Sequence, residues 1–246
     1  MKKTALITGA NKGIGFETAR QLAQREYYVF IGCRNRENGT AALEKLHAEA
    51  LTDTEFIQLD VTVLTSVNNA RTEIGKKTQT LDILINNAGI SGIPQNPTAA
   101  TADNFRLVYE TNVYGVVNVT SAFIDLMQQA EAPRIVNVSS NMGSLTLQSD
   151  PNYPAYDYKV LAAYASSKSA MNMYTVHLAY ELRDTKFKVN AVCPGYTKTD
   201  FTNNLAPGTV EAAGKRIVKY ALIDQTGPTG KFFSEEANPT TGEIAW

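Results

Sequence analysis

The sequence predicts a single α/β domain in which helices cover both faces of a parallel sheet, and three observations predict it. Short apolar runs alternate with longer segments of helical periodicity through the 246 residues, the pattern of right-handed strand–helix–strand units. No linker, low-complexity segment or internal repeat divides the chain, so we expect one domain over residues 1–246. Glycine or polar residues follow nearly every apolar run, and such sheets bind ligands beyond the carboxyl ends of their strands.

Seven short apolar runs are the predicted strands, because their length suits a buried strand better than a helix. They cover residues 4–7, 28–32, 55–59, 81–85, 134–138, 188–192 and 231–233. Helical periodicity fills several gaps between them, over residues 14–25, 39–50, 66–77 and 163–183. A helix between two strands returns the chain to the same end of the sheet, so we expect a doubly wound, seven-stranded parallel sheet.

Charge and composition exclude several classes of function. The chain has 23 Lys+Arg against 24 Asp+Glu, so no electrostatic feature points to nucleic acid or an anionic membrane as a partner. Two His and two Cys cannot supply a His- or Cys-rich metal site, and no metal is expected. The basic start is followed by too short an apolar run for a signal peptide, so the expected location is the cytoplasm.

A glycine-rich loop separates the first strand from the first helix. Gly9, Gly13 and Gly15 have the spacing GxxxGxG, and no Lys-[Ser/Thr] pair follows as it would in a P-loop. Glycines let the backbone turn tightly and let a phosphate approach the free N–H groups of the helix. The loop therefore favours a dinucleotide, and the alternative is an ordinary glycine-rich turn.

The residues after the second strand bear on the choice between the two nicotinamide cofactors. An acidic residue there would accept the ribose hydroxyls and repel a 2′-phosphate. This chain has Cys33 and Arg34 at that point, and Lys12 lies in the glycine loop. Two cations without an acid favour NADP(H), although a neutral residue also admits NAD(H). Alternatively, Arg34 and Arg36 only solvate the start of a helix.

Tyr164 and Lys168 lie one helical turn apart at the start of the longest predicted helix. An ammonium group beside a phenol stabilises the phenolate and lowers the phenol pKa from about 10. Tyr164 would then donate or accept a proton. Histidine is the usual residue for this role, but the chain has only two.

Together these motifs resemble the short-chain dehydrogenase/reductase family, in the shorter of its subclasses, over essentially the whole chain. The matching motifs stand in the family's order, at residues 8–15, 86–89, Asn112, Ser140 with 141–143, Tyr164 with Lys168, and 194–199. The resemblance implies a Rossmann fold and hydride transfer between NAD(P)H and a ketone or aldehyde.

The resemblance also implies the role of each site residue. Tyr164 would exchange a proton with the substrate oxygen, Lys168 would tune Tyr164 and hold the ribose, Ser140 would bind the carbonyl, and Asn112 would hold a water. Ser140 is preferred to Ser139 because the family's serine is followed by two residues and a glycine. The implied cofactor contacts are Gly9, Asn11, Lys12, Gly13, Ile14, Gly15, Arg34, Asp60, Val61, Asn87, Ala88, Gly89, Tyr164, Lys168, Pro194, Gly195, Thr197 and Thr199.

Two segments depart from the short subclass or surround the expected pocket. An insertion of roughly residues 144–162 precedes Tyr164, as it does in the carbonyl reductases of the family, and carries Tyr153, Tyr156 and Tyr158. These tyrosines either form an aromatic wall for a bulky apolar carbonyl compound or only cover the surface. Residues 199–214 resemble the family's substrate lid, with a surface helix as the alternative.

The expected function is therefore an NAD(P)-dependent carbonyl reductase or alcohol dehydrogenase with a small-molecule substrate. A catalytically idle dinucleotide-binding sensor is the alternative, which the four intact catalytic residues disfavour. Relatives pair through the helices that hold Asn112 and Tyr164, so a homo-oligomer is a further expected partner, although the insertion could block that pairing.

Overall fold

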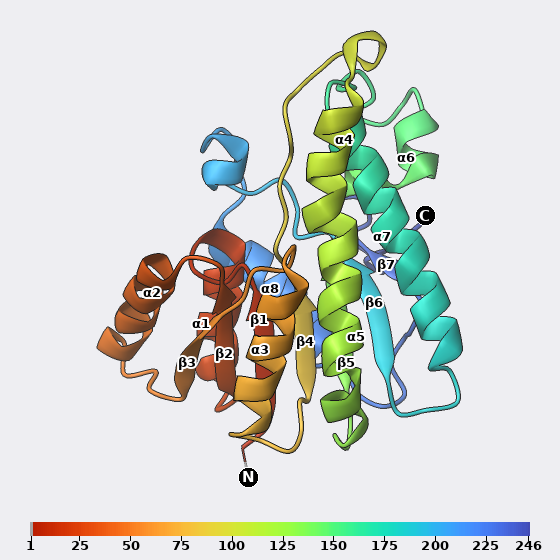
Figure 1. Ribbon diagram of the computed structural model, residues 1–246. Helices are drawn as coiled ribbons and strands as arrows, with labels where there is room; N and C mark the ends of the chain where they lie inside the picture. Colours follow the sequence, from red (N-terminus) through yellow and green to blue (C-terminus); the bar gives the residue numbers. More distant parts are fainter. Residues whose placement is uncertain (1) are drawn as a thin grey trace.

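The computed structural model describes residues 2–246 and shows one sheet of eight strands in the order β3-β2-β1-β4-β5-β6-β7-β8 (Figure 1). The strands are β1 (Thr4–Thr8), β2 (Tyr28–Cys33), β3 (Thr54–Gln58), β4 (Ile83–Asn86), β5 (Arg134–Val138), β6 (Lys188–Val192), β7 (Phe232–Phe233) and β8 (Glu243–Ile244). All neighbouring pairs from β3 to β7 are parallel. The crossover between β3 and β4 makes this a doubly wound sheet.

The expected count of seven strands is wrong, because β8 adds an eighth strand that runs antiparallel to β7. Its two residues, Glu243 and Ile244, are exposed or half-buried and form no apolar run. A strand this short is held by its pairing with Phe232 and Phe233 rather than by its own composition. The sheet is therefore mixed at one edge and parallel elsewhere.

Helices lie on both faces of the sheet and close two separate cores. The principal helices are α1 (Gly13–Ala23), α2 (Arg36–Ala48), α3 (Leu64–Gly75), α4 (Ala102–Tyr109), α5 (Gly115–Gln128), α6 (Leu145–Ser149), α7 (Ala162–Glu181) and α8 (Val210–Ala221). Helices α1, α2 and α8 cover one face, while α3, α5 and α7 cover the other (Figure 1).

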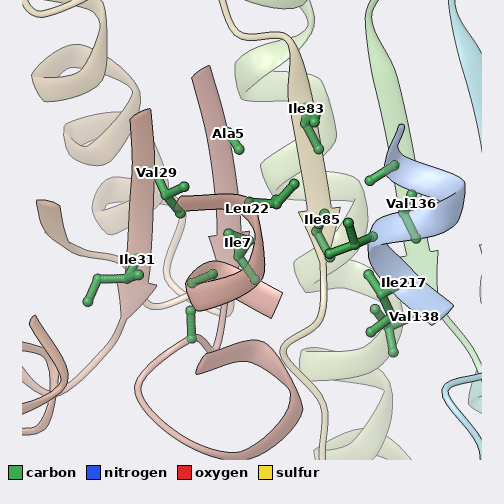
Figure 2. Close-up of a cluster of buried hydrophobic side chains, with 14 of the residues drawn as sticks. Ala5, Ile7, Leu22, Val29, Ile31, Ile83, Ile85, Val136, Val138 and Ile217 are labelled. Atoms are coloured by element: carbon green, nitrogen blue, oxygen red, sulfur yellow. The ribbon is translucent and has the colours of Figure 1, made fainter. Parts of the chain in front are cut away.

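Alternate residues of each central strand enter opposite cores, as the two-residue period of a strand requires. In β1, Ala5 and Ile7 pack toward α1 and α8, whereas Leu6 packs toward α5 and α7. Figure 2 shows the first of these cores, which includes Ile85 of β4 and Ile217 of α8. Burial on both faces holds the strands in register, and the register holds the loops at their carboxyl ends.

The insertion, for which residues 144–162 were expected, contains α6 and a series of turns before α7 begins at Ala162. It is tied to the C-terminal segment, because the Ser144 hydroxyl donates to the Ala245 carbonyl at 2.7 Å. The N–H and hydroxyl of Thr146 donate to the Trp246 carbonyl at 3.2 and 3.0 Å. The Trp246 ring stacks on Phe232, with 5.5 Å between ring centroids.

Over residues 2–246, each helix is too short or too polar to cross a lipid bilayer.

Candidate active site

The loops that follow β1, β4, β5 and β6 meet at one end of the sheet, because these strands are parallel neighbours. The Thr8 hydroxyl accepts the N–H groups of Asn87 and Ala88, each at 3.0 Å. In return, the Asn87 amide donates to the carbonyls of Thr8 and Gly9 at 2.9 and 3.2 Å. The glycine loop and the loop after β4 therefore form one hydrogen-bonded unit.

The glycines of the first loop leave space that the side chain of any other residue would fill. Gly9 and Gly13 have φ of +64° and +58°, a region that side chains disfavour. A Cβ atom on Gly15 would lie 2.4 Å from the Asn87 amide nitrogen. No side chain caps the start of α1, and its first turn contains no acid. The free N–H groups and the helix dipole thus suit a phosphate group, and the chain's residues fit a dinucleotide.

Lys12 and Arg34 are both exposed beside this loop, but they differ in their contacts. The backbone N–H of Ala10 donates to the Gly32 carbonyl at 3.1 Å, which brings the end of β2, and Arg34 after it, next to the glycine loop. The Lys12 ammonium makes a 2.8 Å ion pair with Asp200 of the opposite loop. A phosphate that used Lys12 would therefore have to compete with Asp200.

The other expected cofactor residues occupy the same end of the sheet. Asn11 and Ile14 are half-buried in the glycine loop and α1, and Gly89 follows Ala88 after β4. Asp60 accepts the Thr62 N–H at 3.0 Å, and Val61 packs against α5 at Gly115.

The loop after β6 is held in a defined shape beside the glycine loop. Arg216 donates to the Pro194 carbonyl at 2.6 Å, and Gly195 has φ of +90°. The Thr197 hydroxyl donates to the Gly195 carbonyl at 3.0 Å. Thr199 reaches the glycine loop, since a Cβ on Gly13 would lie 3.5 Å from its methyl group.

Tyr164 and Lys168 lie on the buried side of the first turns of α7 and are 8% and 4% exposed. The Lys168 ammonium donates to the Val138 carbonyl at 2.7 Å and lies 5.7 Å from the centre of the Tyr164 ring. Burial lowers the pKa of Lys168 to about 8. Lys168 therefore loses its proton at a lower pH than an exposed lysine does.

The expected lowering of the phenol pKa is wrong for this structure. Burial raises the pKa of Tyr164 above its ordinary value of 10.0, and the hydrogen bond with the Ser140 hydroxyl only partly opposes that rise. The Lys168 ammonium is engaged with Val138 instead of the phenol oxygen. Tyr164 is therefore held as a neutral, protonated phenol.

Asn112 is fully buried in a single π-helical turn, Glu110–Tyr114, that joins α4 to α5. Its side-chain carbonyl accepts the Ile90 N–H, and its amide donates to the Ile90 carbonyl, both at 2.9 Å. A Cβ on Gly89 would lie 3.3 Å from the Asn112 carbonyl oxygen and 3.6 Å from the Lys168 ammonium. Asn112 and Lys168 therefore border the same small space.

The two serines after β5 have different surroundings. Ser139 is 2% exposed, and its hydroxyl donates to the side chain of Asn172 on α7 at 2.7 Å. Ser140 is half-buried and accepts the Met142 N–H at 3.2 Å, which caps the turn of residues 141–143. Ser140 is also the serine that contacts Tyr164, so Ser139 has a packing role and Ser140 faces the site.

Phe201 lies against Tyr164, with 5.5 Å between ring centroids, from the 3₁₀ turn Asp200–Thr202. Residues 199–214, the segment of the expected lid, divide at Thr209. From Val210 onward they belong to α8, where the Glu211 carbonyl accepts a hydrogen bond from Gln21 of α1 at 3.0 Å. Residues 199–208 form the loop over the site, and a bridge between Thr197 and Gly208 closes its base.

The insertion also reaches the site, through Tyr153. Burial raises the pKa of the Tyr153 phenol, and the side chain of Asn141, next to Ser140, opposes the rise by hydrogen bonding. Tyr158 is exposed, and Tyr156 lies under the Lys159 ammonium at 4.5 Å. Tyr153 therefore contacts the loop that contains Ser140.

Asp200 and Phe201 were not singled out from the sequence. Both directly follow the expected residue Thr199, but their partners, Lys12 and Tyr164, are far away in the chain. Two signals placed the segment near the site: the position of Thr199 after the sixth strand, and the resemblance of residues 199–214 to the family's substrate lid.

Comparisons with known proteins agree with this arrangement. A family model described as short chain dehydrogenase matches residues 3–209. The (-)-isopiperitenone reductase of Mentha piperita is 32% identical, with 96% of this chain and 97% of that protein covered. The structure of salutaridine reductase from Papaver somniferum has a TM-score of 0.84 at 30% identity and covers 95% of this chain and 100% of its own.

A carbonyl reductase from chicken fatty liver, solved with NADPH bound, is similar over nearly the whole fold. It has a TM-score of 0.85 and 26% identity, with 100% of this chain and 99% of that chain covered. The family model, the relatives and the site geometry agree, and the chain belongs to the short-chain dehydrogenase family.

Proposed function

We propose that this chain is an oxidoreductase that interconverts small-molecule carbonyl compounds and alcohols with NADP(H). The proposal rests chiefly on one observation: Tyr164, Ser140 and Lys168 lie together beside the end of the sheet that the glycines line. Relatives named as reductases support the same chemistry.

The residues of the chain divide the work around a substrate oxygen. The Ser140 hydroxyl binds the carbonyl oxygen and polarises it. The Tyr164 phenol, kept protonated by its burial, gives its proton to that oxygen during reduction. Lys168 and Asn112, on either side of Gly89, then return a proton toward Tyr164. The bound nicotinamide cofactor supplies or accepts the hydride.

The proposed cofactor contacts are the residues named from the sequence, and a preference for NADP(H) rests on Lys12 and Arg34. Both are cationic and exposed, and Lys12 pairs with Asp200 of the opposite loop. The similar carbonyl reductase that was solved with NADPH supports this choice.

The proposed substrate is bulky and apolar. Large apolar side chains stay exposed in the segments that follow β4, β5 and β6, namely Ile93, Leu145, Tyr158, Tyr196, Phe201 and Leu205. Phe201 touches the catalytic tyrosine itself. Exposed apolar groups at the opening of a site favour a ligand that covers them from water.

The test is the absorbance of NADPH during incubation with a panel of ketones and aldehydes of increasing size. Oxidation of NADPH that depends on the carbonyl compound supports the proposal. Tight NADPH binding without turnover of any member of the panel would instead favour the idle sensor.

A further inference from the structure

We propose that Ser167 is a positioning residue that fixes the side chain of Asn112 toward Lys168 and so keeps the proton path to Tyr164 intact. Ser167 belongs neither to the expected catalytic set nor to the expected cofactor contacts. The proposal rests on the proposed function, since it concerns the same proton transfer.

Ser167 and Asn112 form a fully buried pair between two helices. The Asn112 amide donates to the Ser167 hydroxyl oxygen at 2.9 Å, and both residues are 0% exposed. The Ser167 hydroxyl hydrogen is already used, because it donates to the Tyr164 carbonyl at 2.7 Å. The oxygen of Ser167 therefore serves Asn112 only as an acceptor.

This contact determines what Asn112 offers to the space beside Gly89. Ile90 takes one amide hydrogen of Asn112, and Ser167 takes the other. The Asn112 carbonyl oxygen accepts one hydrogen bond from the Ile90 N–H, which leaves it a second lone pair. With both amide hydrogens occupied, Asn112 presents an acceptor to Lys168 and to any water between them.

The contact also connects two helices at the place where one of them is irregular. Asn112 lies in the π turn Glu110–Tyr114, and Ser167 lies in α7 between Tyr164 and Lys168. A π turn widens the helix and often occurs at functional sites. The Asn112–Ser167 hydrogen bond ties this widened turn to the segment of α7 that carries both proton-transfer residues.

The groups around Lys168 determine whether removal of Ser167 should raise or lower the pH at which Lys168 loses its proton. Among the described residues, the groups that face its ammonium are the Tyr164 phenol on α7, the Cys193 thiol after β6, the Val138 carbonyl of β5 and the Asn112 carbonyl of the π turn. An oriented carbonyl favours the charged ammonium. Without Ser167, the Asn112 carbonyl is held less firmly beside the ammonium and favours its charge less, so Lys168 loses its proton at a lower pH.

The chain contains a matched control for the experiment. Ser166 is the adjacent serine, and its hydroxyl donates to the Ala163 carbonyl at 3.1 Å, as that of Ser167 does to Tyr164. The bond to Asn112 distinguishes the two serines. Ser167→Ala and Ser166→Ala therefore differ mainly in whether they remove that bond.

The test compares kcat across pH for the wild type, both single variants, Asn112→Ala and the double variant Asn112→Ala/Ser167→Ala. We expect Ser167→Ala to lower kcat about five- to tenfold, the value of one buried hydrogen bond. The alkaline limb should move to lower pH by about half a unit. Ser166→Ala should change neither, and Ser167→Ala should add no further loss when Asn112 is already alanine.

Hydrogen exchange of the Asn112 side-chain amide, followed by NMR, supplies a measurement without turnover. Exchange should be slow in the wild type and in Ser166→Ala, and faster in Ser167→Ala. An unchanged exchange rate, an unchanged pH profile, or equal losses with and without Asn112 would each overturn the role of Ser167. Absence of carbonyl turnover in the wild type would overturn the proposed function, and the exchange result would still decide the contact.

Discussion

The interior of the site and its opening are built in different ways. Asn112, Tyr164 and Lys168 are buried within helices and hydrogen-bonded to backbone or to each other's neighbours. The segments around the opening, the insertion before α7 and residues 199–208, consist largely of turns and carry exposed apolar side chains such as Leu145 and Leu205. In Figure 1, α6 of the insertion lies beyond the end of the sheet, next to α7.

This difference separates two tasks, the transfer of a proton and the selection of a ligand. A buried, hydrogen-bonded interior holds proton-transfer groups in one geometry whatever the substrate. An exposed apolar opening gains its stabilisation only when a ligand covers it, so it discriminates between ligands. Substitutions in the interior should alter the rate for all substrates, and substitutions at the opening should alter which substrates bind.

The largest expected effect comes from the interior. Tyr164→Phe removes the proton donor and keeps the ring, so kcat should fall by about 10²- to 10⁴-fold for small and large ketones alike. The dissociation constant for NADPH and the unfolding temperature should change little. If the loss were confined to large ketones, Tyr164 would belong to the opening and the comparison would fail.

Lys168 predicts a pH dependence of stability. Its pKa is about 8 in the folded chain against 10.5 ordinarily, so between these values the unfolded chain binds more protons. The contribution of Lys168 to the free energy of unfolding therefore rises with pH between these two values, by on the order of 3 kcal/mol. Urea unfolding of the wild type and Lys168→Met from pH 7 to 10.5 measures it.

The difference between the two curves isolates Lys168 from the thiols and phenols that titrate over the same range. Lys168→Met should lack the rise. Parallel curves for the two proteins would show that Lys168 is hydrated and not part of a buried interior.

Phe201 tests the opening. Phe201→Ala should lower kcat/KM about tenfold for a large cyclic ketone, because roughly half of an aromatic side chain's burial is lost. Acetone, too small to cover Phe201, should react at an unchanged rate. Met173→Ala is the control, since Met173 is also exposed but lies on α7 outside these loops. Equal losses for both ketones would move Phe201 into the interior group.

The smallest effect is expected at the ion pair between the two loops. Asp200→Asn frees Lys12 for a phosphate, so NADPH should bind more tightly, by less than about fivefold because exposed ion pairs contribute little. NADH affinity should stay the same. Weaker NADPH binding in this variant, measured by titration calorimetry, would show that Asp200 supports the cofactor site.

The parts of the fold that follow from local pattern agree with the sequence. The strands expected over residues 134–138 and 188–192 match β5 and β6 to the residue, because buried runs end where polar loops begin. Helix α2 begins at Arg36 rather than at residue 39, since Asn35 caps a polar, exposed first turn that has no apolar period. Strand β8 was missed because only pairing with β7 makes it a strand.

The site also has a part that the sequence predicts and a part that it does not. The glycine loop and the residues after β4, β5 and β6 could be placed from topology, which gathers strand ends. The contacts of Asp200, Phe201 and Ser167 could not, because each joins segments distant in the chain. The direction of the Tyr164 pKa also depends on burial, which no spacing reveals.

The stacking of Trp246 on Phe232 has a practical consequence. Trp246 is the only tryptophan of the chain, and its backbone carbonyl is bonded to Thr146 of the insertion. Intrinsic fluorescence excited at the indole therefore comes from one place, beside the segment proposed to meet the substrate. Movement of the insertion on binding should change emission intensity or wavelength, so the protein carries its own optical reporter and needs no attached dye.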